Sequence, residues 1–250
     1  MQSQVDAPAR LLASESSWRR SALERVKVRI GTSAFPLRLA QEIRIEAHLG
    51  AVRLRNRLDP GMRRCARELA RLRELRLHFG CGSRVLEGWI NLDGWSAPGI
   101  DYVCDLRVGL PLADDSCAVI FSEHVLEHFD PQFVPRVLGE LRRVLRSGGT
   151  LRIVVPDCAK FARAYASGDL TWFRTAVPDA ATAGDALNDT FRNHFHRFAY
   201  DFETLAGALR QAGFREIRES AHQASALAEL RIDQEVPSRI VSNLYLEARK

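Results

Sequence analysis

The sequence predicts an α/β protein with a Rossmann-like, seven-stranded, mostly parallel sheet, helices on both of its faces and a helical N-terminal arm. Two observations indicate this fold. From Leu75 onward, short apolar runs alternate with stretches of helical periodicity, as in repeated βαβ units. A Gly-x-Gly turn, Gly80 to Gly82, directly follows the first of these runs, and Asp93 ends the second. At 250 residues with 46% hydrophobic content, the chain is long enough for one such domain and an appendage.

The N-terminal part of the chain is basic. Residues 1–76 hold 17 of the 36 Lys and Arg residues but 8 of the 31 Asp and Glu residues, a net charge of +9 against −4 for the remainder. Such a segment suits contact with an anionic membrane surface or with a partner in a biosynthetic complex. A solvated helical face explains the same charges equally well.

This basic segment also has helical spacing. Apolar residues predict helices between Ser21 and Leu75, the clearest over Met62–Leu75 after the start signal Asp59-Pro60-Gly61. We expect residues 1–60 to form a helical arm, partly disordered, and residues 61–250 to form the α/β domain.

Neither a secretory leader nor a membrane span is indicated, since the start lacks an apolar core and no apolar run approaches 18 to 20 residues. Five scattered cysteines without a Cys-x-x-Cys pair favour a reduced compartment. The expected location is the cytoplasm.

The predicted elements of the domain follow in order. A helix over Pro131–Arg146, with Ser147-Gly148-Gly149 as its stop, separates the fourth and fifth strands, and a second helix covers Asp201–Gln211. Two closing strands are expected at Phe214–Ile217 and Arg239–Glu247. The five earlier strands are predicted at Leu75–Phe79, Trp89–Asp93, Asp101–Cys104, Ala118–Ser122 and Leu151–Val155.

Residues 166–198 fit none of these elements well. Periodicity there is weak and small and polar residues are frequent, so the segment reads as an insertion after the fifth strand. Insertions at this point commonly cover a substrate, and we expect a lid.

The turn after the first strand indicates a nucleoside cofactor. Glycine lets the backbone approach a ligand, and an acid at the end of the next strand binds ribose hydroxyls. Ser83 to Gly88 is too short for the usual crossover helix, whose N-terminus would hold a pyrophosphate, and the third glycine of the dinucleotide motif is missing. A cofactor without phosphates therefore fits better.

Successive motifs then resemble the class I S-adenosylmethionine-dependent methyltransferases, in particular the branch that includes sugar and ubiquinone-type enzymes. The resemblance covers Leu75 to Asp157 in the expected order. The motifs are Leu-His-Phe-Gly-Cys-Gly, Asn-Leu-Asp, Asp105-Leu106, Leu110-Pro111-Leu112, Ser122-Glu123-His124-Val125-Leu126-Glu127-His128 and Leu145-Arg146-Ser147-Gly148-Gly149.

The resemblance implies positions for S-adenosylmethionine. Gly80 and Gly82 would lie under its methionine and ribose, and Asp93 would accept hydrogen bonds from the ribose hydroxyls. Asp105 with Leu106 would flank the adenine, and Ser122 with Glu123 would lie beside the sulfonium. A loop-capping role is the alternative for both aspartates.

His78 departs from the family, which commonly has an acid there that helps hold the methionine amino group. If His78 contacts the cofactor, its protonation would weaken affinity below about pH 6.5. A histidine satisfied inside the strand is the alternative reading.

Methyl transfer to a hydroxyl requires alignment and a base. His124, just after the fourth strand, is the favoured candidate, followed by His196. For His128 a local capping role is expected. His194 and His196 with Asp189 lack a clear further ligand, so we expect no metal.

The resemblance implies methyl transfer to a small-molecule or glycan-linked acceptor, and the supply of histidines favours transfer to oxygen. One alternative is an RNA or protein methyltransferase, although the basic arm has few aromatic residues for base stacking and nucleic acid binding is not expected. Another is a catalytically inactive, cofactor-binding scaffold within a biosynthetic complex. The sequence does not specify the oligomeric state.

Overall fold

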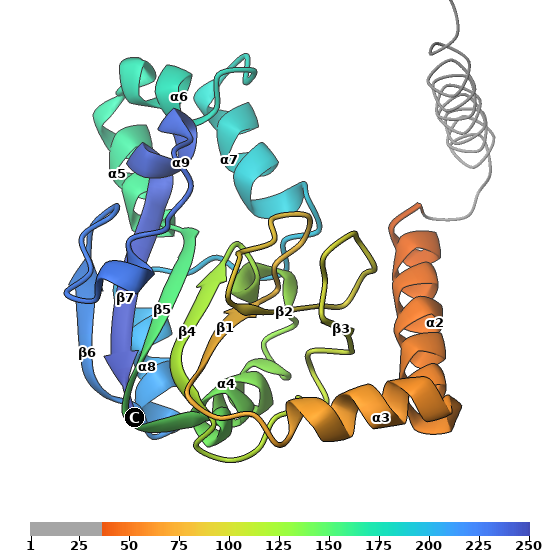
Figure 1. Cartoon of the computed structure of the whole chain (residues 1–250). Coiled ribbons are helices and arrows are strands. Elements are labelled where there is room, and N and C mark those ends of the chain that lie inside the picture. Colours follow the sequence, from red (N-terminus) through yellow and green to blue (C-terminus); the bar gives the residue numbers. More distant parts are fainter. Residues whose placement is uncertain (1–36) are drawn as a thin grey trace, which may run out of the picture. The chain divides into compact units, whose positions relative to one another are not determined.

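The computed structural model describes residues 37–250 (Figure 1). The chain divides into two compact units, Met1–Ala51 and Val52–Lys250, and helix α2 (Leu37–Leu58) spans the division. The sheet and its helices belong to the second unit. The predicted helical and disordered structure of residues 1–36 lies outside the described residues, so the role of the basic arm remains a prediction.

A seven-stranded sheet with order β3-β2-β1-β4-β5-β7-β6 forms the second unit. Strands β1 to β5 are parallel, and β7 is antiparallel to both β5 and β6. The predicted Rossmann-like fold is confirmed. The strands are β1 (Leu75–Phe79), β2 (Ile90–Asp93), β3 (Tyr102–Val103), β4 (Cys117–Glu123), β5 (Leu145–Pro156), β6 (Arg215–Ser220) and β7 (Asn243–Arg249).

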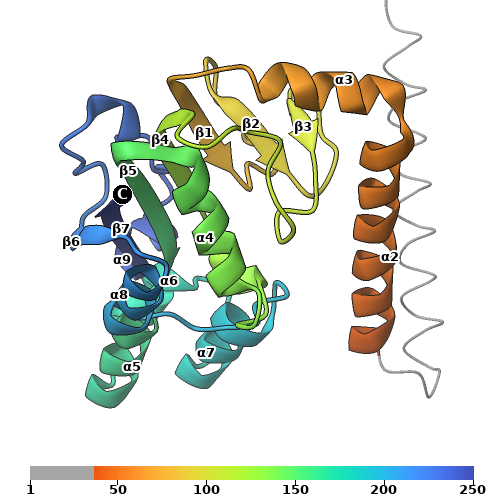
Figure 2. The same cartoon turned by 90° about the horizontal axis from the view of Figure 1, so that it is seen from below.

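One face of this sheet is apolar and covered by helices. Helices α4 (Val134–Val144) and α8 (Phe202–Gln211) lie on the same side of the sheet, as the view from below shows (Figure 2), and their buried residues join one core with alternate residues of the strands. Helix α3 (Pro60–Leu69) packs against the same core. Fully buried leucines on α4 and the strands supply most of the stabilisation here.

The opposite face carries polar side chains, and among residues 52–250 no long helix covers it. The prediction of helices on both faces therefore does not hold for this face, because the connection from β1 to β2 is too short to form one. Arg152 is fully buried on β5 and makes two hydrogen bonds to Asp233, of 2.8 and 2.6 Å, and one of 3.2 Å to Glu247. The segment between β6 and β7, with the short helix η2 (Ala228–Leu230), supplies Asp233 and packs Leu230 on this face. An unpaired buried charge is costly, so the pairing of Arg152 with Asp233 favours this one position of the covering segment on the sheet.

The connection between β1 and β2 contains no helix, as its length predicts. Asn91 holds it instead: its side chain accepts from the backbone of Leu86 at 2.9 Å and donates to the carbonyls of Leu86 and Trp89. These hydrogen bonds fix the loop to the start of β2. They thereby also fix the glycine turn, with which the loop begins.

A helical layer lies beyond the carboxyl ends of the parallel strands (Figure 1). Its apolar core, around Phe161, Phe173 and Ala186, is separate from that of the sheet. The sequence-predicted lid falls in this layer, and a lid function remains a prediction. The layer consists of α5 (Cys158–Ser167), α6 (Leu170–Ala176), α7 (Ala183–Arg192) and α9 (Pro237–Ser242).

Several predicted boundaries differ from the structure, and three of these differences have a clear physical cause. Helix α3 ends at Leu69, well before Leu75, because Glu74 adopts a left-handed conformation and Leu75 already pairs in the sheet. Pro237 starts a helix, so the final strand begins at Asn243 and not at Arg239.

The third error lies between α4 and β5. The predicted helix extends to Arg146, but α4 ends at Val144 and Leu145 pairs with Cys117 as the first residue of β5. Pairing in the sheet outweighs the local helical pattern at this point.

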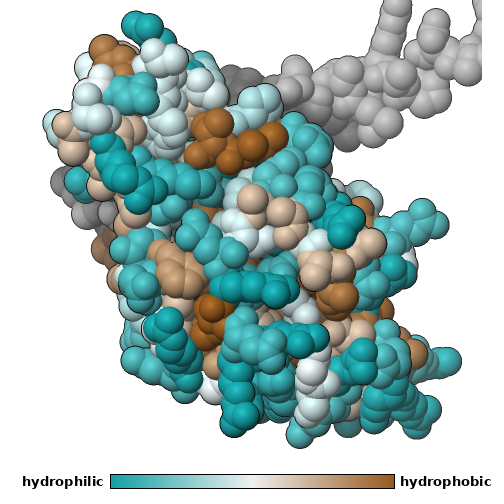
Figure 3. Space-filling view, turned by 90° about the vertical axis from the view of Figure 1, so that its left-hand side faces the viewer, coloured by the Kyte–Doolittle hydropathy of each residue, from teal (hydrophilic) through white to brown (hydrophobic). Residues whose placement is uncertain are grey.

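The edge strand β6 is largely charged on its exposed positions, and the surface on this side of the molecule is mostly hydrophilic (Figure 3). Charged residues discourage pairing of an edge strand with another chain. Among residues 37–250, no helix combines the length and apolar character required to cross a membrane.

Candidate active site

The glycine turn and Asp93 form one hydrogen-bonded unit at the carboxyl ends of β1 and β2. The Asp93 carboxylate accepts the backbone N–H of Gly82 and that of Trp95, each at 2.8 Å. Since a carboxylate has about four acceptor positions, two remain for a ligand. Asp93 is half-buried, so these positions are accessible.

The two glycines of this turn serve different purposes. A Cβ on Gly80 would lie 2.4 Å from Cγ2 of Val125, which is too close for any side chain. A Cβ on Gly82 would meet no atom within 4 Å. Both have positive φ, +73° and +56°. Gly80 is therefore required by packing, while Gly82 borders open space that a ligand can fill.

Asp105 and Leu106 follow β3 and are both buried. Asp105 receives hydrogen bonds from Nε of Arg107 at 2.9 Å and Nη2 at 3.0 Å, and Arg53 on α2 also donates to it. Burial acts to raise the pKa of Asp105, but these arginine hydrogen bonds outweigh it and the pKa is lowered. The carboxylate is thus charged and already paired.

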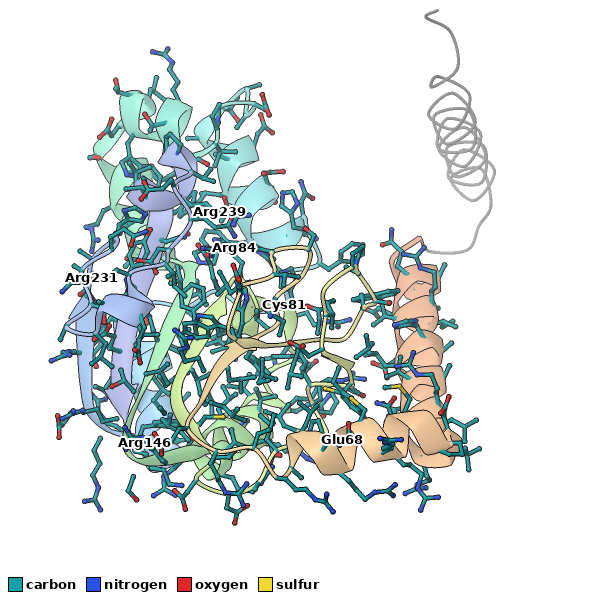
Figure 4. All side chains as sticks on the ribbon, in the orientation of Figure 1. Glu68, Cys81, Arg84, Arg146, Arg231 and Arg239 are labelled. Carbon is teal, nitrogen blue, oxygen red and sulfur yellow. The ribbon has the colours of Figure 1, made fainter. Side chains whose placement is uncertain are left out.

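Ser122 and Glu123 end β4 and face opposite sides of the sheet. Glu123 accepts from Nη1 of Arg84 at 3.0 Å and from the backbone N–H of Gln234 at 3.4 Å. The Ser122 hydroxyl is buried and has no hydrogen-bond partner among the described residues. Arg84 and Cys81 both lie on the loop after β1 (Figure 4), so Glu123 ties this loop to the end of β4.

His78 is buried inside the sheet. Its Nδ1 lies 3.3 Å from Oδ1 of Asn91 and its ring packs beside Phe121. Burial lowers the pKa of His78 to about 4. The expected loss of cofactor affinity below pH 6.5 is therefore not supported, because the imidazole stays neutral there; its evident role is to hold Asn91.

His124 has an unusual backbone and two specific neighbours. Its φ is +55°, a conformation that is uncommon outside glycine and that clusters at functional sites. Nδ1 lies 2.9 Å from Oε1 of Glu127, and Nε2 lies 3.1 Å from the Asn243 side-chain amide. The ring is thus oriented by a carboxylate on one side.

Glu127 lies at the centre of a histidine cluster. Its side chain is buried, and although His124 pairs with it by distance, neither carboxylate oxygen accepts a well-aligned hydrogen bond among the described residues. Nε2 of His196 lies 3.9 Å from Oε1, and the rings of His128 and His196 pack edge to face at 4.7 Å. Burial acts to raise the pKa of Glu127, and the surrounding histidines lower it overall.

A cavity of about 830 Å³ opens beside this cluster, large enough for a small-molecule ligand. It lies between the ends of the strands and the helical layer, and His124, His128 and His196 face it. Most other lining residues are small or polar. They include Asp179, Asp185, Asn188, Asp189, Asn193, His194, Ser238 and Arg239.

The structure thus brings the predicted residues into two groups: the glycine turn with Asp93, and His124 with His196. His194, paired with Asp189 at 3.3 Å, is exposed and stands apart from Glu127. Sequence reasoning missed Arg53, Arg84 and Asn243, which reach the site from distant segments and carry no local motif.

Residues 55–153 match a protein family described as a methyltransferase domain. A search of curated proteins found no match.

Solved structures of similar fold were also found. One is a methyltransferase of Thermotoga maritima described as a possible histamine N-methyltransferase (16% identity, 70% of this chain and 82% of that chain covered, TM-score 0.44). Another is a Mesorhizobium loti S-adenosylmethionine-dependent methyltransferase (18%, 76% and 97%, 0.41). A third is the Burkholderia thailandensis 1,6-didemethyltoxoflavin-N1-methyltransferase (17%, 100% and 93%, 0.42).

The sheet order, the glycine turn with an acid at the end of β2 and the family match define a class of enzyme. Residues 55–153 carry this methyltransferase domain, whose class uses S-adenosylmethionine as its cofactor. The residues present fit that cofactor: Gly82 borders open space, Asp93 retains acceptor capacity, and the buried Ser122 hydroxyl has no hydrogen-bond partner within residues 37–250.

Proposed function

We propose that the enzyme methylates a hydroxyl group of a small-molecule or glycan-linked acceptor bound in the cavity, with His124 as general base. One observation carries this proposal: His124 faces the cavity while a buried carboxylate lies 2.9 Å from its Nδ1. A base oriented in this way accepts a proton at its other nitrogen.

The cofactor would be held by the turn and the strand ends. Asp93 would accept the ribose hydroxyls, Gly80 and Gly82 would line the path of the methionine and ribose, and the Leu106 backbone would lie beside the adenine. Asp105 is already paired with two arginines, so we assign it a structural role beside the adenine and not a direct contact with the cofactor. S-adenosylmethionine supplies an electrophilic methyl group.

His124 would take the proton from the acceptor hydroxyl at Nε2. Glu127 would hold the ring in place during this step, because its Oε1 lies 2.9 Å from Nδ1 of His124. Asn243 suits both states, since its Nδ2 donates to neutral His124 and its Oδ1, which has no hydrogen-bond partner among the described residues, can accept from Nε2–H after rotation of the amide.

The cavity lining favours a hydroxylated acceptor. Asp, Asn and His side chains hydrogen-bond to sugar hydroxyls, and they form much of this lining. Arg239 faces the same cavity and has no carboxylate partner among residues 37–250. An anionic group on the acceptor would pair with it.

The test has two stages. Calorimetric titration of S-adenosylmethionine and S-adenosylhomocysteine should show binding that Asp93→Ala weakens at least about tenfold, since two hydrogen-bond acceptors are lost. No binding by folded wild-type protein would contradict the assignment of the cofactor site.

Release of S-adenosylhomocysteine is then measured against neutral sugars, sugar phosphates and lipid-linked glycans. Replacing His124 by Gln should lower kcat by about 10²- to 10⁴-fold with cofactor affinity unchanged. His222→Gln, at a histidine that does not line the cavity, is the matched control. Binding without turnover on any acceptor would favour the scaffold alternative, and turnover on RNA or protein alone would replace the proposed acceptor class.

A further inference from the structure

Three residues beside the cavity, Glu127, His128 and His196, are arranged as a site for a cation. The ligand atoms of Glu127, His128 and His196 all lie within 4.8 Å of one another. Two imidazoles and one carboxylate are a common ligand set of catalytic zinc. We propose that these three residues bind a divalent transition ion of the Zn²⁺ type at the inner end of the cavity.

The state of Glu127 is an independent sign of a missing partner. Its side chain is 2% exposed, its Oε1 lies 2.9 Å from Nδ1 of His124, and neither of its oxygens accepts a well-aligned hydrogen bond among the described residues. A buried carboxylate in this condition is costly, and buried charges in proteins are normally paired or coordinate metals. A divalent cation would supply the missing interaction.

Both histidines are prepared as ligands by hydrogen bonds to the backbone. Nδ1 of His196 pairs with the carbonyl of Thr190, which directs the unprotonated Nε2 toward Glu127. His128 hydrogen-bonds to the backbone of Phe195. Such backbone partners fix the tautomer and ring orientation of histidines that ligate metals.

The segment that carries His196 is itself strained, since the adjacent His194 and Phe195 both have positive φ, 55° and 65°. This backbone turns His196 back toward η1 (Leu126–His128), where Arg197 N–H also donates to the Glu127 carbonyl at 2.7 Å.

The geometry requires a modest contraction. Metal–ligand bonds of about 2.0–2.2 Å place tetrahedral ligand atoms about 3.3 Å apart, whereas Nε2 of His196 and Oε1 of Glu127 are 3.9 Å apart. Three protein ligands leave one position open, and the two histidines face the cavity. If the proposed methyl transfer holds, an acceptor hydroxyl in that position would have a lowered pKa and His124 would accept its proton.

The experiment measures metal binding directly, without turnover. Chelator-treated protein is titrated with Zn²⁺, with Co²⁺ as a spectroscopic probe and with Mg²⁺ as a comparison that imidazole ligands disfavour. One Zn²⁺ per chain is expected, with visible Co²⁺ absorption typical of tetrahedral coordination. Glu127→Gln and His196→Ala should each weaken Zn²⁺ binding at least about tenfold. His222→Ala, whose ring lies near Gln234, should bind as the wild type does.

Several results would overturn the proposal. They are absence of Zn²⁺ binding by the wild type, unchanged binding in both ligand variants, and a thiolate-to-Co²⁺ charge-transfer band, which would place the ion on one of the free cysteines. S-adenosylmethionine affinity measured in the same variants shows that they are folded. Failure of the wild type to bind S-adenosylmethionine while Zn²⁺ still binds would remove the proposed methyl transfer and leave the metal site.

Discussion

The carboxylates at the carboxyl edge of the sheet differ in how they are satisfied. Asp93, Asp105 and Glu123 each accept at least two hydrogen bonds from backbone or arginine donors. Glu127, more deeply buried than Asp93, accepts none in good alignment and is surrounded by histidines. The first three build a surface that is complete before any ligand arrives, and the fourth has a charge that still needs a partner.

The strongest test of the prebuilt part is Gly80→Ala. The added methyl would meet Val125 and adopt a positive φ, so we expect the free energy of unfolding to fall by about 3–4 kcal/mol. Gly82→Ala, the matched variant, should cost about 1–2 kcal/mol for its backbone alone, yet lose cofactor affinity. Urea unfolding and calorimetry separate the two; equal stability losses would show that Gly82 is also fixed by packing.

The next largest loss of stability is expected at acidic pH, through His78 on the strand that leads into the same turn. Its pKa is about 4 in the folded protein and about 6.5 when unfolded, so the unfolded chain binds more protons between these values. Stability is therefore full above pH 6.5 and falls by about 3 kcal/mol toward pH 4. Urea midpoints measured across this range should drop less in His78→Gln. Identical slopes in both proteins would contradict the burial of a neutral ring.

A smaller loss is expected from Asp105→Asn. Removing the charge leaves Arg53 and Arg107 without their counter-ion, but Arg53 is 41% exposed and water compensates in part. We expect the free energy of unfolding to fall by about 2 kcal/mol, less than for a fully buried pair. The same comparison at high salt distinguishes a partly buried pair from a surface pair, because salt would screen a surface pair and remove the difference in the free energy of unfolding.

The smallest effect is expected at the unsatisfied carboxylate. In chelated protein, Glu127→Gln removes the contact with Nδ1 of His124 together with a buried charge that lacks aligned donors among residues 37–250, and these terms offset to within about 1 kcal/mol. Thermal unfolding with and without Zn²⁺ measures this. A large loss in the absence of metal would mean that Glu127 is as well satisfied as Asp105.

The features that were predicted most accurately from the sequence are those that depend only on neighbouring residues. Strand β1 and the turn from Gly80 were placed correctly because an apolar run and two glycines suffice to define them. Arg53 reaches Asp105 across 52 positions, and Glu127 meets His196 across 69, so no local pattern brings them together. No metal was expected from the sequence for the same reason. The histidines considered there, His194 and His196, are close in sequence, whereas the other proposed ligands, Glu127 and His128, come from the distant helix η1.

The helical layer has an apolar core of its own, in which Phe161 packs against Trp172, Phe173 and Phe191. Substitutions on its cavity side, at positions such as Asp185 or Asn188, are therefore separated from the core that stabilises the sheet. Under the proposed function, such substitutions would change which acceptor is methylated without disturbing the core of the sheet or the cofactor half of the domain.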